Sequence, residues 1–70
     1  MERYTSTVQF FGEKKGWGFI KSLDGGKDIF VHYEDIEMDG FKVLKKGQKV
    51  SFEIIETDRG KRAKKVRVEE

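Results

Sequence analysis

The chain has 70 residues and a net charge of only +2, although 40% of its residues are charged. This length supports a single small hydrophobic core, so we expect residues 1–70 to form one domain, and the absence of cysteine excludes disulfides and thiolate metal sites. The N-terminal residues contain no basic segment followed by an apolar run, and no stretch is long enough to cross a bilayer, so we expect a soluble cytoplasmic protein without a membrane partner.

Five segments rich in aromatic and β-branched residues follow one another along the chain, separated by glycines. This composition is typical of short antiparallel strands. We expect these strands at residues 4–11, 17–23, 28–33, 49–56 and 61–69. The Asp24-Gly25-Gly26 step suits a tight hairpin that pairs the second strand with the third. The longest connection, residues 34–48, is expected to hold one short helical turn at residues 34–38. The pattern therefore predicts an all-β fold, a small barrel of five antiparallel strands.

Alternation along the middle hairpin separates largely aliphatic from aromatic side chains. Successive side chains leave opposite faces of a sheet, and only one face lines the core. We expect the inner set to comprise Ile20, Ile29, Val31 and Tyr33, joined by Val8, Val50, Phe52, Ile54, Val66 and Val68. The outer face then carries Trp17, Phe19, Phe30 and His32. The opposite arrangement is disfavoured because it exposes the aliphatic residues together and buries a titratable ring without an obvious partner.

An exposed patch of rings indicates a binding surface. Unpaired nucleobases offer flat faces that stack on aromatic side chains, whereas a duplex hides those faces. Lys14, Lys15 and Lys21 flank the patch and are placed to meet phosphates. Gly16 and Gly18 would leave room for a base to lie flat against Trp17. Single-stranded nucleic acid is therefore the expected ligand.

The charges are unevenly distributed along the chain. Residues 24–39 carry six acidic side chains and one lysine, so the rest of the chain is strongly basic. The acidic residues from Glu34 to Asp39 are interpreted as solvated turn residues rather than as a catalytic pair of carboxylates. The densest basic run contains Arg59, Lys61, Arg62, Lys64, Lys65 and Arg67. This run has two interpretations, a solvated strand edge protected by its charges or a surface that faces phosphates.

The sequence resembles a bacterial-type cold-shock domain over almost its whole length. KGWGFI at residues 15–20 resembles the first ribonucleoprotein motif of that family, with Trp17 where Phe or Tyr is usual, and DIFVHY at residues 28–33 resembles the second. VQFF at residues 8–11 and DGFKVLKKGQKVSFEI at residues 39–54 match the flanking segments. RGKRAKKVRV at residues 59–68 takes the place of a proline-containing turn and the last strand.

The resemblance implies a five-stranded antiparallel oligonucleotide-binding (OB-fold) barrel. It implies that the chain binds single-stranded RNA and DNA, and acts as an RNA chaperone or as a regulator of transcription or translation. The stacking residues that it implies are Phe10, Trp17, Phe19, Phe30, His32, Tyr33 and Phe41. The supporting polar contacts that it implies are Lys15, Asp28, Lys42 and Arg59. For Phe41, a hydrophobic plug over the barrel end is the alternative role.

Four positions depart from the family pattern: Gln9 replaces a usual lysine, Phe10 a usual tryptophan, Gly12 a usual Asn or Asp, and Lys61 the proline. The first two changes remove a phosphate contact and some stacking area from the first strand. Strict alternation also places Val8 and Phe10 on one face, so an outward Phe10 requires a β-bulge near Gln9.

Other classes of protein fit the sequence less well. No pair of amphipathic helices is visible to support an RNA-recognition motif, and His32 has neither a cysteine partner nor the metal-ligand cluster of an enzyme. We therefore expect a monomer with no enzymatic activity, cofactor, metal site or small-molecule substrate. Two alternatives stay open: a small basic barrel that binds duplex DNA, and a protein-interaction module that uses the same aromatic patch.

Overall fold

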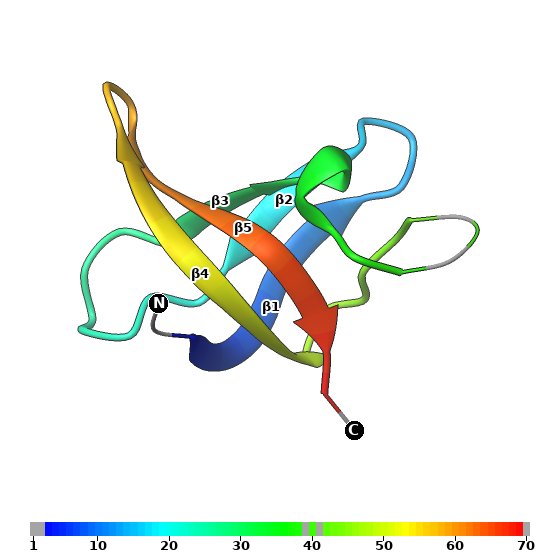
Figure 1. Cartoon of the computed structure of the whole chain (residues 1–70), viewed down its shortest axis with the longest axis horizontal. Coiled ribbons are helices and arrows are strands. Elements are labelled where there is room, and N and C mark those ends of the chain that lie inside the picture. The colour runs from blue at the N-terminus through cyan, green and yellow to red at the C-terminus, as the bar shows by residue number, and fades with distance from the viewer. Residues whose placement is uncertain (1–2, 39, 41, 70) are drawn as a thin grey trace.

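Five strands and one turn of 3-10 helix make up the computed structural model, which describes residues 3–38, 40 and 42–69. The elements are β1 (Tyr4–Gly12), β2 (Trp17–Ile20), β3 (Ile29–His32), η1 (Tyr33–Asp35), β4 (Lys49–Thr57) and β5 (Gly60–Val68), as Figure 1 shows. The all-β prediction is confirmed, with strand ends shifted by a few residues. The helical turn begins at Tyr33 rather than at Glu34. No helix within the described ranges is long and apolar enough to span a membrane.

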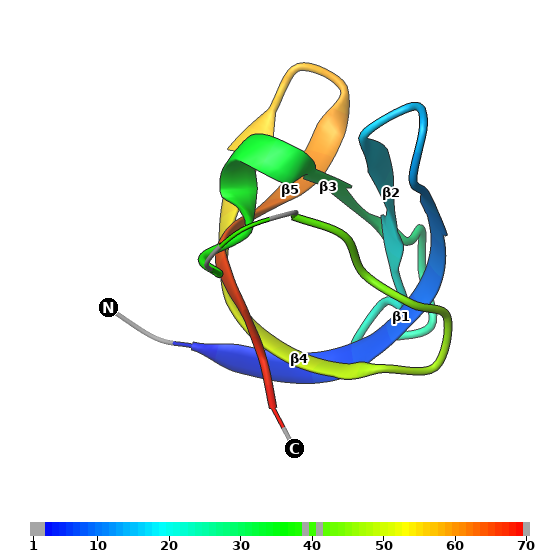
Figure 2. The same ribbon diagram turned by 90° about the vertical axis from the view of Figure 1, so that its right-hand side faces the viewer.

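The strands close into a barrel in the order β1-β2-β3-β5-β4. Figure 2 shows them as a ring, with residues 42–48, which lead into β4, lying across one end. Four of the five pairings are antiparallel, but β3 and β5 run parallel. The wholly antiparallel prediction is therefore wrong at this one seam. The reason is that the chain crosses to β4 after β3, and β5, which returns antiparallel to β4, then runs in the direction of β3.

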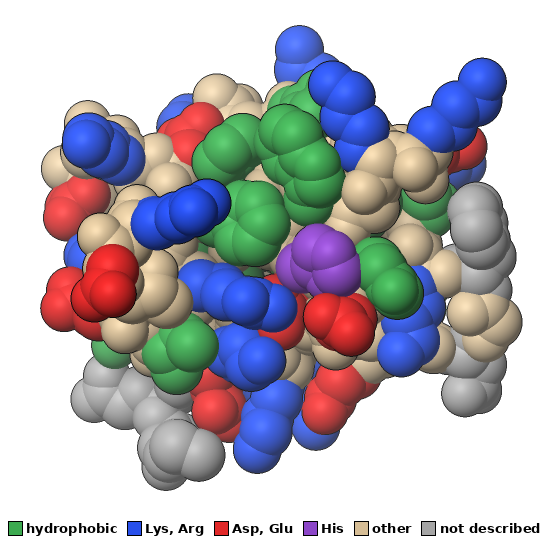
Figure 3. Space-filling view, turned by 90° about the horizontal axis from the view of Figure 1, so that it is seen from above, with side chains coloured by type: hydrophobic (Ala, Val, Ile, Leu, Met, Phe, Trp, Pro, Cys, Tyr) green, Lys and Arg blue, Asp and Glu red, His purple; other side chains and the backbone are tan. Residues whose placement is uncertain are grey.

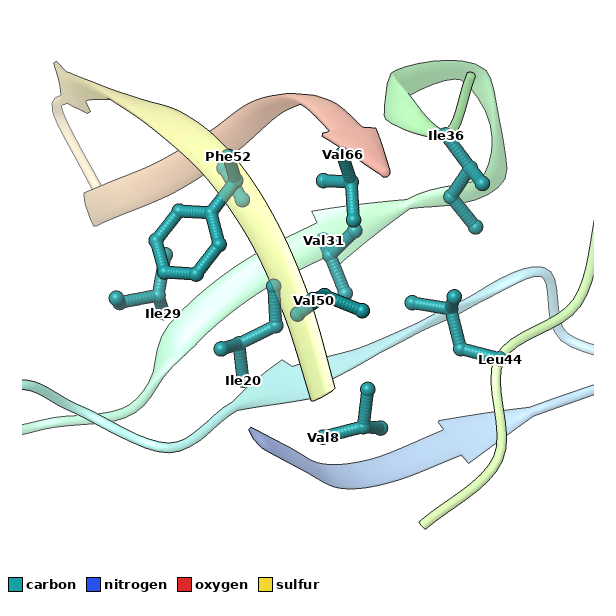
Figure 4. Packing of buried hydrophobic residues seen from close by; sticks show 10 residues of the cluster. Val8, Ile20, Ile29, Val31, Ile36, Leu44, Val50, Phe52 and Val66 are labelled. Carbon is teal, nitrogen blue, oxygen red and sulfur yellow. The ribbon is translucent and has the colours of Figure 1, made fainter. Parts of the chain in front are cut away.

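The core is aliphatic apart from one phenylalanine. Its buried residues are Val8, Ile20, Ile29, Val31, Ile36, Leu44, Val50, Phe52, Ala63 and Val66, most of which are labelled in Figure 4. The expected inner set is thus largely confirmed, although Ile54 and Val68 are only partly buried. Tyr33 was expected inside with them but is 46% exposed. It begins η1, where the chain leaves the sheet and the alternation of faces ends.

A β-bulge turns the first strand so that Phe10 faces outward. The register between β1 and β2 shifts between Val8 and Phe10, which leaves Gln9 as the extra residue. Val8 is consequently 1% exposed and Phe10 46% exposed. A bulge inserts one residue and so resets which side chains face the core. The bulge expected near Gln9 is confirmed.

Candidate nucleic-acid interface

Strand pairing lines up aromatic residues across the outer face of the sheet. Phe10 on β1 is paired with Phe19 on β2, and Phe19 is paired with Phe30 on β3. Side chains of directly paired residues lie on the same side of a sheet. Trp17 and His32 form a second pair next to this row. Because these positions lie on strands, their backbone hydrogen bonds hold the rings in place.

The rings touch one another and form a continuous surface, which we call the aromatic face. It consists of Phe10, Trp17, Phe19, Phe30, His32 and Tyr33. The Trp17 ring lies at its centre, with centroid distances of 6.2 Å to Phe10, 5.8 Å to Phe19 and 6.2 Å to Phe30. Such distances are those of edge-to-face and offset ring contacts. In Figure 3 the hydrophobic side chains of this face lie together beside the histidine, with Lys and Arg side chains around them.

The glycine between Trp17 and Phe19 does not serve the purpose that the sequence suggested. Gly18 is buried and points into the barrel, against the backbone of Phe10 and Phe11. It therefore permits the close approach of β1 and β2 rather than leaving room for a ligand beside Trp17. Trp17 is only partly buried, and the rings of Phe10 and Phe19 meet it edge-on while the ring of Phe30 is tilted against it.

All four predicted polar contact residues border the aromatic face. The Nζ of Lys15 lies 5.4 Å from the centroid of the Trp17 ring, a distance at which a cation is attracted to the ring face. Lys15 and Lys42 line one hollow beside Tyr33. Asp28 and Arg59 line another hollow beside Phe19 and Phe30. Phe41 lies outside the described residues.

The His32 ring is held by the turn that follows it. Its Nδ1 accepts a hydrogen bond of 3.3 Å from the backbone N–H of Glu34. In the neutral imidazole the other nitrogen, Nε2, then carries the hydrogen. The carboxylate of Glu34 also lies 3.3 Å from Nδ1. The start of η1 therefore fixes the orientation of this ring.

The carboxylate of Asp35 is buried beneath the edge of the aromatic face, so the prediction that this residue is solvated is wrong. Its side chain has no exposed surface. It accepts hydrogen bonds from Nε and Nη2 of Arg62 (2.9 and 3.2 Å) and from the backbone N–H of His32 (3.1 Å). Lys64 Nζ lies 3.0 Å from Oδ1 of Asp35, the oxygen that also accepts from Nη2 of Arg62. Burial alone would raise the pKa of Asp35, but the bonds from Arg62, Lys64 and His32 outweigh it and lower this pKa.

The basic run of the last strand is largely paired with acidic side chains. Arg62 and Lys64 share Asp35, and Arg67 donates a hydrogen bond of 2.7 Å to Glu37. That bond lowers the pKa of Glu37 and raises that of Arg67. The run is thus neither a bare strand edge nor a uniform phosphate-facing surface. Within the described ranges, no group of three or more His, Cys, Asp or Glu side chains is placed to hold a metal ion.

Sequence reasoning missed Arg62 as a neighbour of the rings. The ζ carbon of Arg62 lies 5.8 Å from the centroid of the Phe30 ring, because the two residues are paired between β3 and β5. The parallel seam between these strands is formed by segments far apart in the chain, and alternation within one strand contains no information about it. A prediction of strand register would have been needed to find this contact.

Comparisons with known proteins find relatives over almost the whole chain. The family model described as "'Cold-shock' DNA-binding domain" matches residues 4–69. The chain is 52% identical over 65 residues to a cold shock-like protein of Aquifex aeolicus, covering 93% of each protein. It is 55% identical over 62 residues to the major cold shock protein CspA of Bacillus cereus, covering 89% of this chain and 91% of that protein.

A solved structure shows the same fold at low sequence identity. The structure titled "drosophila Unr CSD456" superposes with a TM-score of 0.80 and 16% identity. The match covers 99% of this chain but only 27% of that longer chain. At this identity the likeness shows the fold alone.

Proposed function

This chain belongs to the cold-shock domain family, a family of nucleic-acid-binding proteins, and from that premise we propose that it binds single-stranded RNA and DNA. The observation that supports this proposal is the aromatic face itself, in which five rings on the outer side of the sheet adjoin one another and Tyr33 at the start of η1, with cations at the border. Each base that stacks on such a ring contributes roughly 1 to 3 kcal/mol. A duplex hides the faces of its bases, so unpaired strands are the ligand.

In this proposal the strand lies across the sheet with its bases on the rings and its phosphates toward the cations. The stacking residues are Phe10, Trp17, Phe19, Phe30, His32, Tyr33 and Phe41. The supporting polar residues are Lys15, Asp28, Lys42 and Arg59. A protein that covers unpaired bases keeps them from pairing again. We therefore infer the role of an RNA chaperone, or of a regulator of transcription or translation, for a single-domain cytoplasmic monomer without a cofactor or enzymatic activity.

The fluorescence of Trp17 tests the proposal directly because this is the only tryptophan of the chain. A pyrimidine-rich single-stranded oligonucleotide is titrated into the protein, and a duplex of matching sequence serves as the control. We expect the single strand alone to quench the fluorescence. Equal responses to both ligands would favour a barrel that binds duplex DNA. No response to either, from protein shown to be folded, would favour a protein partner for the aromatic face.

A further inference from the structure

One row of paired residues crosses four strands of the barrel, and its fourth member is an arginine. Phe10, Phe19 and Phe30 occupy this row on β1, β2 and β3, and Arg62 on β5 is paired with Phe30. We propose that the planar guanidinium of Arg62 is a further base-stacking position, which extends the track of the nucleic acid beyond the rings onto β5. This inference rests on the proposed binding of single strands.

Contact with the last ring places the guanidinium at the level of the aromatic face. Its ζ carbon lies 5.8 Å from the centroid of the Phe30 ring, which is within the range of a cation–π contact. The guanidinium is planar and delocalised, and bases stack on arginine planes as they do on aromatic rings. A strand that follows the row from Phe10 to Phe30 therefore meets Arg62 next.

A buried carboxylate holds the guanidinium in one orientation. Nε and Nη2 of Arg62 donate to the two oxygens of Asp35 at 2.9 and 3.2 Å, and two parallel bonds of this kind fix the plane of an arginine. Asp35 is itself anchored by the backbone N–H of His32. The plane is thus set before a ligand arrives, so less side-chain entropy is lost on binding. The Arg62 side chain is still 31% exposed, so it remains accessible to a base.

The hollow at the Phe30–Arg62 end of the row has the space and the charge to hold one more nucleotide. A hollow beside Phe19 and Phe30 is bordered by Lys61 and Arg62 on β5 and by Asp58 and Arg59 in the β4–β5 turn. A base in this hollow would lie next to the guanidinium, with Arg59 and Lys61 near its phosphate. Three cations, Arg59, Lys61 and Arg62, and one acidic residue, Asp58, line this hollow, so its lining carries a net positive charge.

Lys64 provides a matched control for the charge of Arg62. It lies 3.0 Å from the same carboxylate, but its ammonium is a point charge without a plane. Arg62→Lys keeps a cation beside Asp35 and removes the plane. Lys64→Ala removes a cation and keeps the plane. These two variants separate stacking from simple charge attraction.

The experiment measures the binding of a short oligothymidine in which one nucleotide at a time is made abasic, so that the base is lost and its phosphate is kept. In the wild-type protein we expect about 5-fold to 100-fold weaker binding for each stacked base that is removed. In Arg62→Lys and Arg62→Ala we expect the intact oligonucleotide to bind about tenfold more weakly, and one abasic position to lose its effect. Lys64→Ala should keep the abasic profile of the wild type.

Urea unfolding of each variant tests whether it is folded under the conditions of the binding experiment. If Arg62→Ala is unstable, Arg62→Lys replaces it, because the lysine retains a cationic partner for Asp35. The inference is overturned if Arg62→Lys binds as tightly as the wild type, or if the Arg62 variants keep every abasic effect, because Arg62 then acts only through its charge or its structural role. If the wild-type protein binds no single strand, the proposed function is overturned as well. That result differs from failure of the Arg62 inference alone, in which the wild type still binds.

Discussion

Gly18 lies so close to Phe10 that a Cβ added to it would be 2.0 Å from the carbonyl oxygen of Phe10 and 2.6 Å from the Cα of Phe11. These atoms belong to the backbone of β1 and cannot turn aside. We therefore expect Gly18→Ala to push β1 away from β2 and to lower the free energy of unfolding by about 3 kcal/mol or more, the upper end of the cost of overpacking. Urea unfolding measures this loss.

Gly47→Ala is the control for that substitution. A Cβ at Gly47 meets no atom within 4 Å, although the residue has φ of +85°. A left-handed conformation costs an alanine roughly 1 to 2 kcal/mol. If Gly18→Ala were no more destabilising than Gly47→Ala, the close approach of the two strands would not be a constraint on the fold.

Removal of a ring from the aromatic face should affect binding more than folding. Trp17 and Phe30 are only partly buried, and they lie on the outer side of the sheet. We expect Trp17→Ala and Phe30→Ala each to weaken single-strand binding by roughly 1 to 3 kcal/mol, with a much smaller loss of unfolding free energy. Because Trp17→Ala removes the fluorophore, calorimetry is the common measurement of affinity for both variants.

The matched core substitution is Phe52→Ala. Phe52 is 0% exposed inside the barrel, so its truncation should cost about 3 to 5 kcal/mol of unfolding free energy while the affinity per folded molecule is kept. The opposite pattern, with Trp17→Ala or Phe30→Ala unfolding the protein and binding otherwise unchanged, would mean that these rings serve the fold and not the ligand.

Salt should weaken binding in proportion to the number of phosphates contacted. Each phosphate that a cation neutralises contributes about −0.7 to the slope of log K against log salt for a single strand. We expect Lys15→Gln to reduce the magnitude of that slope by about 0.7, because Lys15 borders the aromatic face beside Trp17. Lys46→Gln, in the exposed turn before β4, should leave the slope nearly unchanged. Binding that does not depend on salt would instead favour a protein partner.

Asp35 makes stability depend on pH at the acid end. Burial opposes the charge of its carboxylate, but hydrogen bonds from Arg62, Lys64 and His32 lower its pKa below the ordinary value of 3.8. The unfolded chain therefore takes up this proton at a higher pH than the folded protein does. The stabilisation by the carboxylate is fully present above the ordinary pKa and is lost as pH falls through the lower pKa of the folded state.

The measurement for Asp35 is urea unfolding of the wild type and of Asp35→Asn at several pH values. We expect a difference in unfolding free energy of about 1 to 3 kcal/mol at neutral pH, the magnitude of a buried hydrogen bond to a charged group. This difference should shrink as the pH falls below about 4. A difference that stays constant or grows on acidification would show that the charge of Asp35 does not stabilise the fold.

Local patterns in the sequence were sufficient for much of the site. The hairpin of β2 and β3 is closed by adjacent residues, so period-two alternation alone separated Trp17 and Phe19 from the buried Ile20. Alternation alone does not predict the outward position of Phe10, because it places Phe10 on the same face as Val8. Only the family resemblance required the bulge that the structure contains.

Contacts between distant segments were not predicted. Asp35 and Arg62 are 27 positions apart, and their pairing depends on the register between β3 and β5. Without that register, the sequence predicts a solvated turn residue at Asp35 and shows Arg62 only as one member of a basic run. The predicted inward position of Tyr33 is wrong for a local reason, because the alternation of faces ends with β3 and Tyr33 already belongs to η1.

The parallel seam between β3 and β5 also has a consequence during synthesis of the protein on the ribosome. Phe30 cannot pair with Arg62 until β5 has been synthesised, and Tyr4 cannot pair with Phe52 until β4 has been synthesised. Contacts between such distant residues form late because a long loop has to be closed first. Until β5 has emerged, the nascent chain holds β1 to β3 with an unpaired edge, a state that is prone to association with other chains. The last nine residues to join the sheet, Gly60–Val68, therefore end the period in which the growing chain is vulnerable to aggregation.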